Sequence, residues 1–188
     1  MDNWPEEERA LVARARHGDT AAFAVLARHH APVALRVATG ICGSVPDAED
    51  ALQEGLLKAY RALDGFRAES PLRPWLVRIV ANEARNRRRA AGRRLRLVER
   101  VGAQRSVAVT AAPPELEVLA DLESRELWNA LGRLDERDRT IVCLRYFAGF
   151  NEGEMADALG CPAGTVKSRL SRALGRLRPL LDAEVDRD

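Results

Sequence analysis

Residues 150–181 read FNEGEMADALGCPAGTVKSRLSRALGRLRPLL, and their pattern specifies two helices joined by a tight turn. Asn151 can cap a short helix, while Glu154, three residues later, completes a capping box. Gly160 stands where that helix must stop, and Pro162 can open a second, longer helix. A short helix, a glycine turn and a longer helix form a helix-turn-helix, whose second helix lies in the major groove of DNA.

The second helix of this pair is basic on its outward side. Its apolar stripe consists of Val166, Leu170, Leu174, Leu177 and Leu181. Between Ala163 and Arg178 there are five basic residues and no acid. Thr165, Ser168, Arg169 and Arg172 share one face near the start of the helix, where base edges would be met. A solvated surface helix is the alternative, but such a helix normally mixes acids with its bases. We therefore expect duplex DNA as a partner.

Apolar residues recur at helical spacing through most of the remaining chain, and strand signals are nearly absent. Helices are predicted over residues 20–41 with Asp19 as N-cap, over 47–63, over 74–89, from 115 onward, and from Asp135 to Tyr146. The segment 93–114 is rich in arginine and is closed by two prolines. The sequence thus predicts an all-α chain with two small helical domains, 1–92 and 115–188, joined by a basic flexible linker over 93–114.

Composition excludes several classes of protein. The chain has 188 residues, of which 46% are hydrophobic, and a net charge of only +2, but acids and bases alternate in blocks along it. Three widely spaced cysteines argue against a disulfide scaffold and fit a reducing cytosol. No apolar run is long enough to cross a membrane, so we expect a cytoplasmic protein without membrane insertion. No nucleophile, metal-ligand or phosphate-loop pattern occurs, so we expect no enzyme activity and no cofactor.

A second candidate nucleic-acid surface surrounds the predicted helix 74–89. Phe66 lies on a turn beside Arg67, and Trp75 lies at the start of the helix. Arg78, Asn82, Arg85, Asn86 and Arg89 share the face opposite its apolar side. An aromatic ring beside amides and guanidiniums suits unstacked bases, which need a stacking face, edge contacts and phosphate charge. Trp75 is equally compatible with a place in the core.

Taken together, two blocks of the sequence resemble the extracytoplasmic-function (ECF) sigma factors of bacterial RNA polymerase. DAEDALQEGLLKAYRALDGF followed by FRAESPLRPWLVRIVANEARNRRR is similar to the first domain of that family. LGRLDERDRTIVCLRYFAGFNEGEMADALG followed by CPAGTVKSRLSRALGRLRPLL is similar to the second, and GTVKSRLSRA is the most specific motif. The resemblance runs from about Asp19 to Leu181.

The resemblance implies roles for individual residues. Asp50, Gln53 and Glu54, on the helix 47–63, would contact core RNA polymerase, although they could also be merely solvated. Phe66, Arg67, Trp75, Arg78, Asn82, Arg85 and Asn86 would read the melted −10 element, with Phe66 holding a flipped base. Thr165, Lys167, Ser168, Arg169 and Arg172 would read the duplex −35 element.

Partners also follow from the resemblance. Core RNA polymerase and promoter DNA are expected, the linker would thread into the polymerase, and an anti-sigma factor would mask both DNA surfaces. A stand-alone helix-turn-helix regulator of duplex DNA is the alternative function. The block from Phe66 to Arg89 discriminates between the two, because a regulator of duplex DNA alone does not require it.

Overall fold

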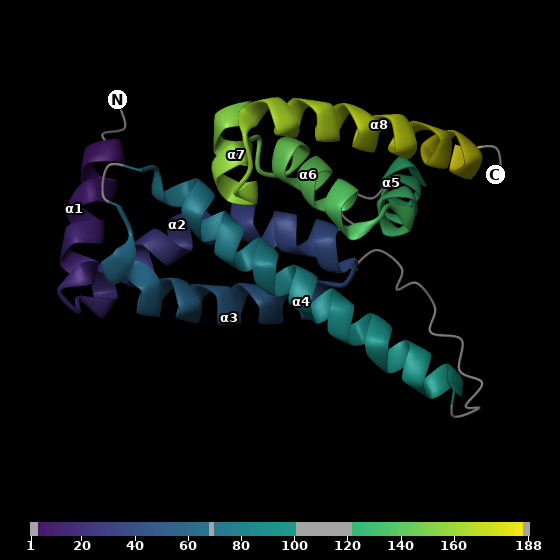
Figure 1. The fold of residues 1–188 in the computed structure, drawn as a ribbon. Helices are drawn as coiled ribbons and strands as arrows, with labels where there is room; N and C mark the ends of the chain where they lie inside the picture. The colour runs from purple at the N-terminus through teal and green to yellow at the C-terminus, as the bar shows by residue number, and fades with distance from the viewer. Residues whose placement is uncertain (1–3, 68–69, 101–121, 186–188) are drawn as a thin grey trace.

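The computed structural model describes residues 4–67, 70–100 and 122–185, except for the side chains of 95–100, 122–125 and 183–185. The elements are α1 (Trp4–Arg16), α2 (Thr20–Cys42), α3 (Val45–Ala62), the short 3₁₀ turn η1 (Leu63–Gly65), α4 (Leu72–Arg100), α5 (Leu122–Arg133), α6 (Glu136–Tyr146), α7 (Glu152–Leu159) and α8 (Ala163–Val185). Over these ranges no strand occurs, which confirms the all-α prediction (Figure 1).

In the N-terminal domain, α2, α3 and α4 pack on one another, and α1 lies against α2 (Figure 1). Small residues allow this close packing: Ala48 and Ala51 of α3 and Ala84 of α4 are fully buried. Gly55 has the same role, because a Cβ added there would lie only 2.7 Å from Cγ2 of Val80. The helices therefore cross at positions that carry little or no side chain.

Helix α1 is an element that the sequence pattern did not predict, and an aromatic and ionic contact holds it to α2. The indole of Trp4 stacks on His29 with ring centroids 3.7 Å apart. The same carboxylate oxygen of Glu8 accepts a hydrogen bond from Trp4 Nε1 at 3.1 Å and lies 2.8 Å from His30 Nε2. Both histidines therefore help to hold α1 against α2.

Most predicted helix ends are confirmed, and one is wrong. Asp19, Asp135 and Asn151 cap their helices, and Gly160 ends α7 with a φ of 62°. The helix expected over 74–89, however, begins at Leu72 and continues to Arg100. Residues 93–100 are thus helical, and the predicted linker starts too early. Arginine, alanine and leucine are good helix formers, which explains the extension. The rest of the predicted linker, up to 114, lies outside the described residues.

The C-terminal domain packs directly on the N-terminal domain. Helix α6 lies against α2, and α7 lies against α4 (Figure 1). One continuous apolar cluster runs through both domains: it includes Val37, Ile41 and Val80 from the first, and Cys143 and Met155 from the second. Nothing in the apolar periodicity of the sequence predicts this contact.

The contact between α1 and α2 leads to a prediction on pH dependence. Burial raises the pKa of the Glu8 carboxyl, but the hydrogen bond and charge of His30 and the bond from Trp4 outweigh it, so that the pKa lies below its ordinary value of 4.5. Folding thus favours the carboxylate, and the resulting stabilisation is present above about pH 4.5 and is lost as the pH falls through the lower folded-state value. We expect Glu8→Gln to lower the urea midpoint at neutral pH, and the gap to wild type to close in acid.

The exposed Glu7, also on α1, provides the matched control. Glu7→Gln should leave the urea midpoint close to wild type over the same pH range. A gap between Glu8→Gln and wild type that stayed constant on acidification would contradict the proposed contribution of the carboxylate.

Candidate nucleic-acid interface

Helices α7 and α8 form the predicted helix-turn-helix, and the basic face of α8 points to solvent. Met155 of α7 and Val166 of α8 are fully buried between the helices and the rest of the domain. On the outer side, Lys167, Ser168 and Arg172 are exposed, while Thr165 and Arg169 are half-buried. The five side chains predicted to read the −35 element therefore all reach the surface.

Local hydrogen bonds orient part of this face. The Ser168 hydroxyl donates to the Thr165 carbonyl at 3.1 Å, and Arg172 Nε donates to the Ser168 carbonyl at 3.2 Å. These bonds hold the Arg172 guanidinium alongside its own helix. An exposed guanidinium is suited to the O6 and N7 acceptors of guanine.

The predicted single-strand face of α4 is placed differently, because it is turned toward the C-terminal domain. Arg78 Nη1 lies 3.5 Å from the Asp157 carbonyl of α7. Arg85 is half-buried and donates to Asn82 Oδ1, and burial lowers the pKa of its guanidinium, although an arginine remains charged. Asn86 is exposed. Arg89 forms a two-bond ion pair with Glu136 of α6, at 2.6 and 2.7 Å.

The aromatic residues of the loop differ from the expectation. Phe66 was expected on an exposed loop tip, but only 5% of its surface is exposed. Its ring packs on the half-buried Trp75, with centroids 4.9 Å apart. The apolar surface of α1, which the sequence analysis did not predict, covers this position through Leu11 and Val12. In this conformation the Phe66 ring is therefore part of a core, whereas Arg67 beside it is exposed.

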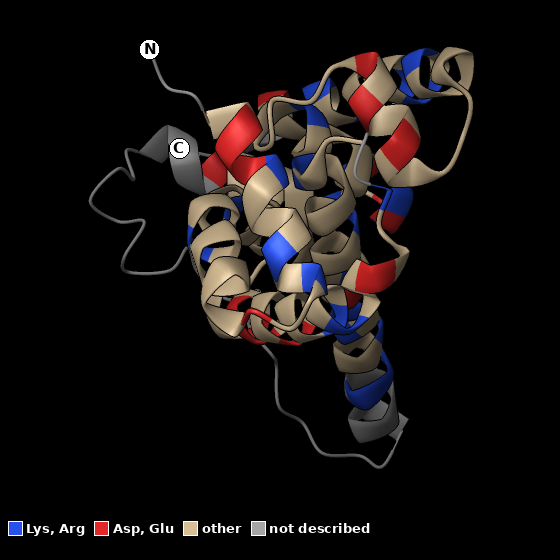
Figure 2. Ribbon diagram, turned by 90° about the vertical axis from the view of Figure 1, so that its left-hand side faces the viewer, with Lys and Arg blue, Asp and Glu red and all other residues tan. Residues whose placement is uncertain are grey.

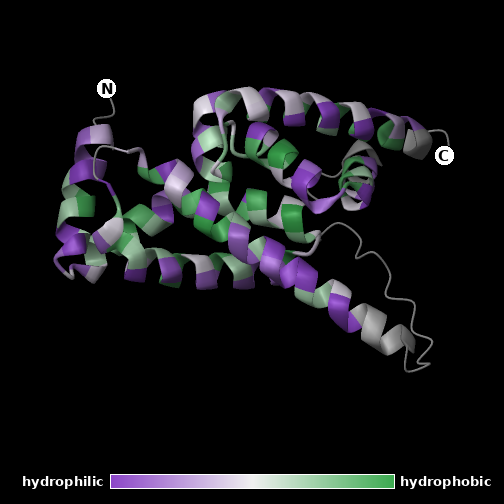
Figure 3. Cartoon of the chain, viewed as in Figure 1, coloured by the Kyte–Doolittle hydropathy of each residue, from purple (hydrophilic) through white to green (hydrophobic). Residues whose placement is uncertain are grey.

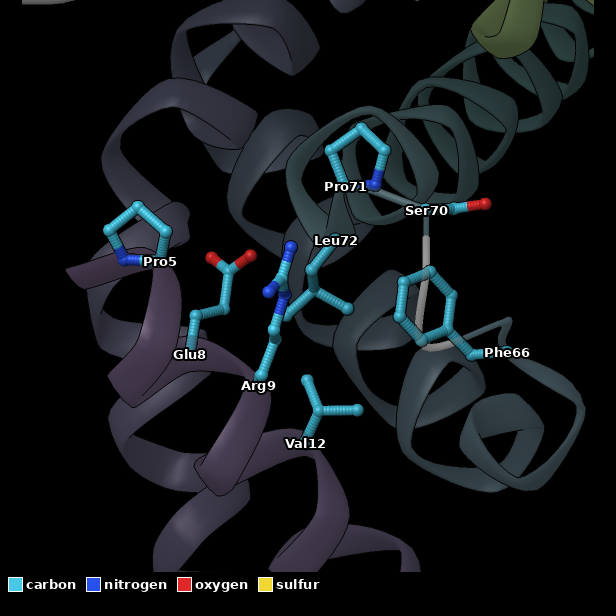
Figure 4. A pocket seen from close by; sticks show the side chains of 8 residues that line it. All are labelled: Pro5, Glu8, Arg9, Val12, Phe66, Ser70, Pro71 and Leu72. Carbon is cyan, nitrogen blue, oxygen red and sulfur yellow. The ribbon is translucent and has the colours of Figure 1, made fainter. Parts of the chain in front are cut away.

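A hollow of about 260 Å³ opens beside Phe66 (Figure 4). Its walls come from α1 and from the chain that leads into α4, with Glu8 and Arg9 on one side and Phe66, Ser70 and Leu72 on the other (Figure 4). Arg9 was not a candidate from sequence, because it lies in a helix that the pattern did not reveal.

The polymerase-facing candidates lie on α3. Asp50 and Gln53 are exposed, and Glu54 is half-buried. Asp50 pairs with Arg87 of α4 at 2.8 Å, while Glu54 shares Lys58 with Glu83 at 3.6 and 2.8 Å. The sequence analysis did not name Leu57, which is 52% exposed and, at i+7 and i+4 from Asp50 and Gln53, continues their face of α3. The sequence alone could have indicated the exposure of Leu57, because this residue lies outside the apolar stripe of its helix, which consists of Ala48, Leu52, Leu56, Ala59 and Leu63.

The distribution of charge agrees with a nucleic-acid interface on α4 and α8. Basic residues gather along the C-terminal half of α4 (Figure 2), and the same part of the helix is hydrophilic where its first turns are apolar (Figure 3). Within the described ranges, no group of three His, Cys, Asp or Glu side chains could hold a metal ion. No helix described by the structure is both long and apolar enough to span a bilayer.

Cys42 and Cys143 are packed rather than reactive. Burial raises the pKa of the Cys42 thiol to about 12 and also raises the pKa of Cys143, which is fully buried. Because the thiolate is the reactive species, neither thiol is activated in this conformation.

Each of the two domains matches a known protein family. Residues 26–94 match the Sigma-70 region 2 family, and residues 124–177 match the Sigma-70 region 4 family. The chain is 35% identical to the RNA polymerase sigma factor NccH of Alcaligenes xylosoxydans xylosoxydans over 180 residues, which cover 95% of this chain and 97% of NccH.

Solved structures agree with the sequence matches. CnrH, a sigma factor of Cupriavidus metallidurans, has been solved in complex with the cytosolic domain of CnrY, with a TM-score of 0.69 and 29% identity over 94% of this chain and 98% of that one. The sigma factor RpoE of Bartonella quintana, in complex with the anti-sigma factor NepR, gives a TM-score of 0.61 and 33% identity over 79% of this chain and 90% of that one. The chain therefore belongs to the ECF family of RNA polymerase sigma factors, the subunits that direct promoter-specific transcription.

Proposed function

We propose that this sigma factor reads the duplex −35 element with α8 and the melted −10 element with α4, and that α3 contributes a contact with core RNA polymerase. The observation that carries the proposal is that the chain has two separate basic surfaces on two different helices. One of them lies on α8, the second helix of the helix-turn-helix, whereas the other, on α4, adjoins a loop with aromatic residues and a hollow. A stand-alone regulator of duplex DNA needs only the first surface.

The assignment of side chains follows their positions. Lys167, Ser168 and Arg172 are exposed near the start of α8, where a recognition helix meets base edges. On α4, Asn82 and Asn86 offer amides for base edges, and Arg78 and Arg85 offer charge for phosphates. Although the Phe66 ring is buried, the hollow beside it could receive a flipped base once the loop adapts, with Arg67 and Trp75 at its margin.

The acidic face of α3 is suited to a basic or mixed protein surface. Asp50, Gln53 and Glu54 supply polar contacts there, and the exposed Leu57 supplies an apolar anchor of the kind that interfaces bury at their centre. We further propose that the protein acts in the cytoplasm, catalyses nothing itself and requires no cofactor.

Run-off transcription with purified core RNA polymerase tests the function as a whole. Adding the chain to core enzyme and a library of promoter-sized templates should produce transcripts with defined start sites. Core enzyme alone provides the control, and sequencing the transcripts should reveal a shared −10 and −35 pattern. A chain that bound duplex DNA but produced no specific starts would be a stand-alone regulator.

Arg172→Ala tests the assignment on α8. Loss of a guanidinium that reads a guanine should weaken binding to the −35 duplex by about 1–3 kcal/mol and relax the preference at one base pair. Arg178→Ala is the matched control, because Arg178 is also exposed on α8 and its removal deletes the same charge. Fluorescence anisotropy with duplexes altered at each position measures both effects. Equal losses for the two variants at every position would mean that Arg172 contributes charge alone.

Asn82→Ala tests the assignment on α4. On a template with a pre-melted bubble, we expect the preference at one position of the −10 element to flatten, while affinity for the upstream duplex stays unchanged. Asn129→Ala is the control, because Asn129 is an exposed asparagine on α5, away from both proposed surfaces. Transcription from bubbles that carry each base in turn measures the preference. If the full preference survived in Asn82→Ala, the amide would have no role in reading the strand.

A further inference from the structure

We infer that the free chain is closed on itself: the C-terminal domain holds the DNA-reading face of α4 while it leaves the face of α8 open. This inference rests on the roles proposed above for the two helices. It adds that the two readers are not equally available, so that single-strand binding requires the domains to separate and duplex binding by α8 does not.

Several arginines of α4 form contacts across the domain boundary. Arg89 and Glu136 form the two-bond ion pair, a geometry that is stronger than a single charged contact. Arg73 donates to the Ala148 carbonyl, and its guanidinium lies over the Phe150 ring, 5.3 Å from the centroid. Arg78 approaches the Asp157 carbonyl. Two arginines of the proposed DNA-reading face, Arg78 and Arg89, are thus engaged by the C-terminal domain, and Arg73 anchors the start of the same helix to it.

The boundary is also closely packed, which separates it from a loose encounter of two domains. A Cβ added at Gly40 of α2 would lie 2.5 Å from Cys143 Sγ and 2.6 Å from Cε2 of Phe147. The backbone of α2 therefore touches the side chains of α6 and of the residue that follows it. Such an approach is possible only because Gly40 has no side chain, and it leaves Cys143 without exposed surface.

A pair of arginines bridges the ends of two helices at the same boundary. Arg139 of α6 donates to the Ile41 carbonyl of α2 at 3.2 Å. Within the C-terminal domain it also donates to three carbonyls at and just beyond the end of α5. Arg88 of α4 donates to the carbonyls of Ile41 and Cys42 and, across the boundary, to Gly132 at 3.1 Å. The negative ends of α2 and α5 are thus held together by shared guanidiniums.

Two features of the closed state favour separation of the domains. Arg78, Asn86 and Arg89 remain exposed at the rim, where a DNA phosphate can compete with Glu136 for Arg89. The Nε atom of Arg73 is buried without a hydrogen-bond partner among the described residues, and an unpaired buried donor is unfavourable. By contrast, α8 packs on α5, α6 and α7, and its basic side, with Lys167 and Arg172, is exposed to solvent in the closed chain.

Gly40→Ala tests the closed state through the fit that only glycine allows. Its matched control is Gly92→Ala on α4, where an added Cβ meets nothing within 4 Å. Both changes favour a helix equally, so a difference between them reports the domain boundary. Cys143 is a native reporter, because opening exposes its thiol, and Cys161, in the turn of the helix-turn-helix, is an internal reference.

The first measurement does not depend on DNA. We expect maleimide labelling of Cys143, followed by mass spectrometry, to be about fivefold to tenfold faster in Gly40→Ala than in wild type or Gly92→Ala, since overpacking of this size shifts an equilibrium by about fivefold or more. Cys161 should label at an unchanged rate, and X-ray scattering should show a larger radius of gyration. A folded Gly40→Ala protein with wild-type labelling and radius would overturn the closed state, whatever α4 reads.

The second measurement addresses masking. A fluorescein-labelled single strand of mixed sequence should bind Gly40→Ala more tightly than wild type, with a ceiling of about tenfold if the open state is about 10% populated in the wild type. Affinity for a mixed-sequence duplex should change much less. An opened chain whose single-strand affinity did not rise would overturn the masking, whereas the bubble experiment with Asn82→Ala separately decides whether α4 reads bases.

Glu136→Ala provides a second route to opening that leaves the packing of α2 on α6 intact. It removes the partner of Arg89 and should raise Cys143 labelling and single-strand affinity in the same direction as Gly40→Ala. Glu152→Ala is its control, because Glu152 is the exposed first residue of α7 as Glu136 is the first residue of α6. Equal behaviour of Glu136→Ala and Glu152→Ala would exclude the ion pair as part of the closure.

Discussion

The contact of the two domains depends on how the buried guanidinium of Arg139 is satisfied. Only 2% of this residue is exposed, and all of its hydrogen bonds are to backbone carbonyls. A buried charge is unfavourable unless hydrogen bonds replace its hydration. Here the carbonyls come from the last turns of α2 and α5 and from Leu134, where the helix dipoles concentrate negative potential. Two helix ends that would otherwise need water are thereby brought to one donor, and the domains meet at that point.

A small residue allows the two domains to pack closely beside these hydrogen-bonded helix ends. Once the ends of α2 and α5 meet at Arg139 and Arg88, α2 must run along α6, and only a residue without a side chain fits at Gly40. The apolar residues on either side then merge into one cluster rather than two. Because the same approach brings Glu136 to Arg89 and Ala148 to Arg73, the position of the proposed DNA-reading face of α4 follows from the packing and not from its own sequence.

Much of the architecture could be predicted from sequence because it depends on local rules. Caps such as Asp19, Asp135 and Asn151 act within one turn of their helices, and the apolar stripe of α8 reports its own buried face. Helix α1 escaped prediction because its contacts with His29 and His30 of α2 join aromatic and charged groups rather than a simple apolar stripe. The burial of Phe66 was missed for the same reason, because residues of α1 cover its ring. The exposure of Leu57 was readable, since it lies off the stripe of α3, but the partners of Arg78 and Arg89 were not, because they come from residues far along the chain.

The ion pairs between the domains and within the N-terminal domain reduce the charge that the arginines of α4 present to solvent. The net charge of +2 is the sum of nearly equal numbers of acids and bases, and some of those acids pair with arginines of α4, as Asp50 does with Arg87 and Glu136 does with Arg89. A nucleic acid that binds α4 must then replace a carboxylate on Arg89 as well as release its own counterions. The replaced ion pair is itself weakened by salt, which partly offsets the weakening of the DNA contact. The number of arginines on α4 therefore overstates the charge that this surface presents to DNA in the closed chain. On α8, Arg176 pairs with Asp135 and Asp138, whereas Lys167 and Arg172 near the start of the helix are exposed to solvent.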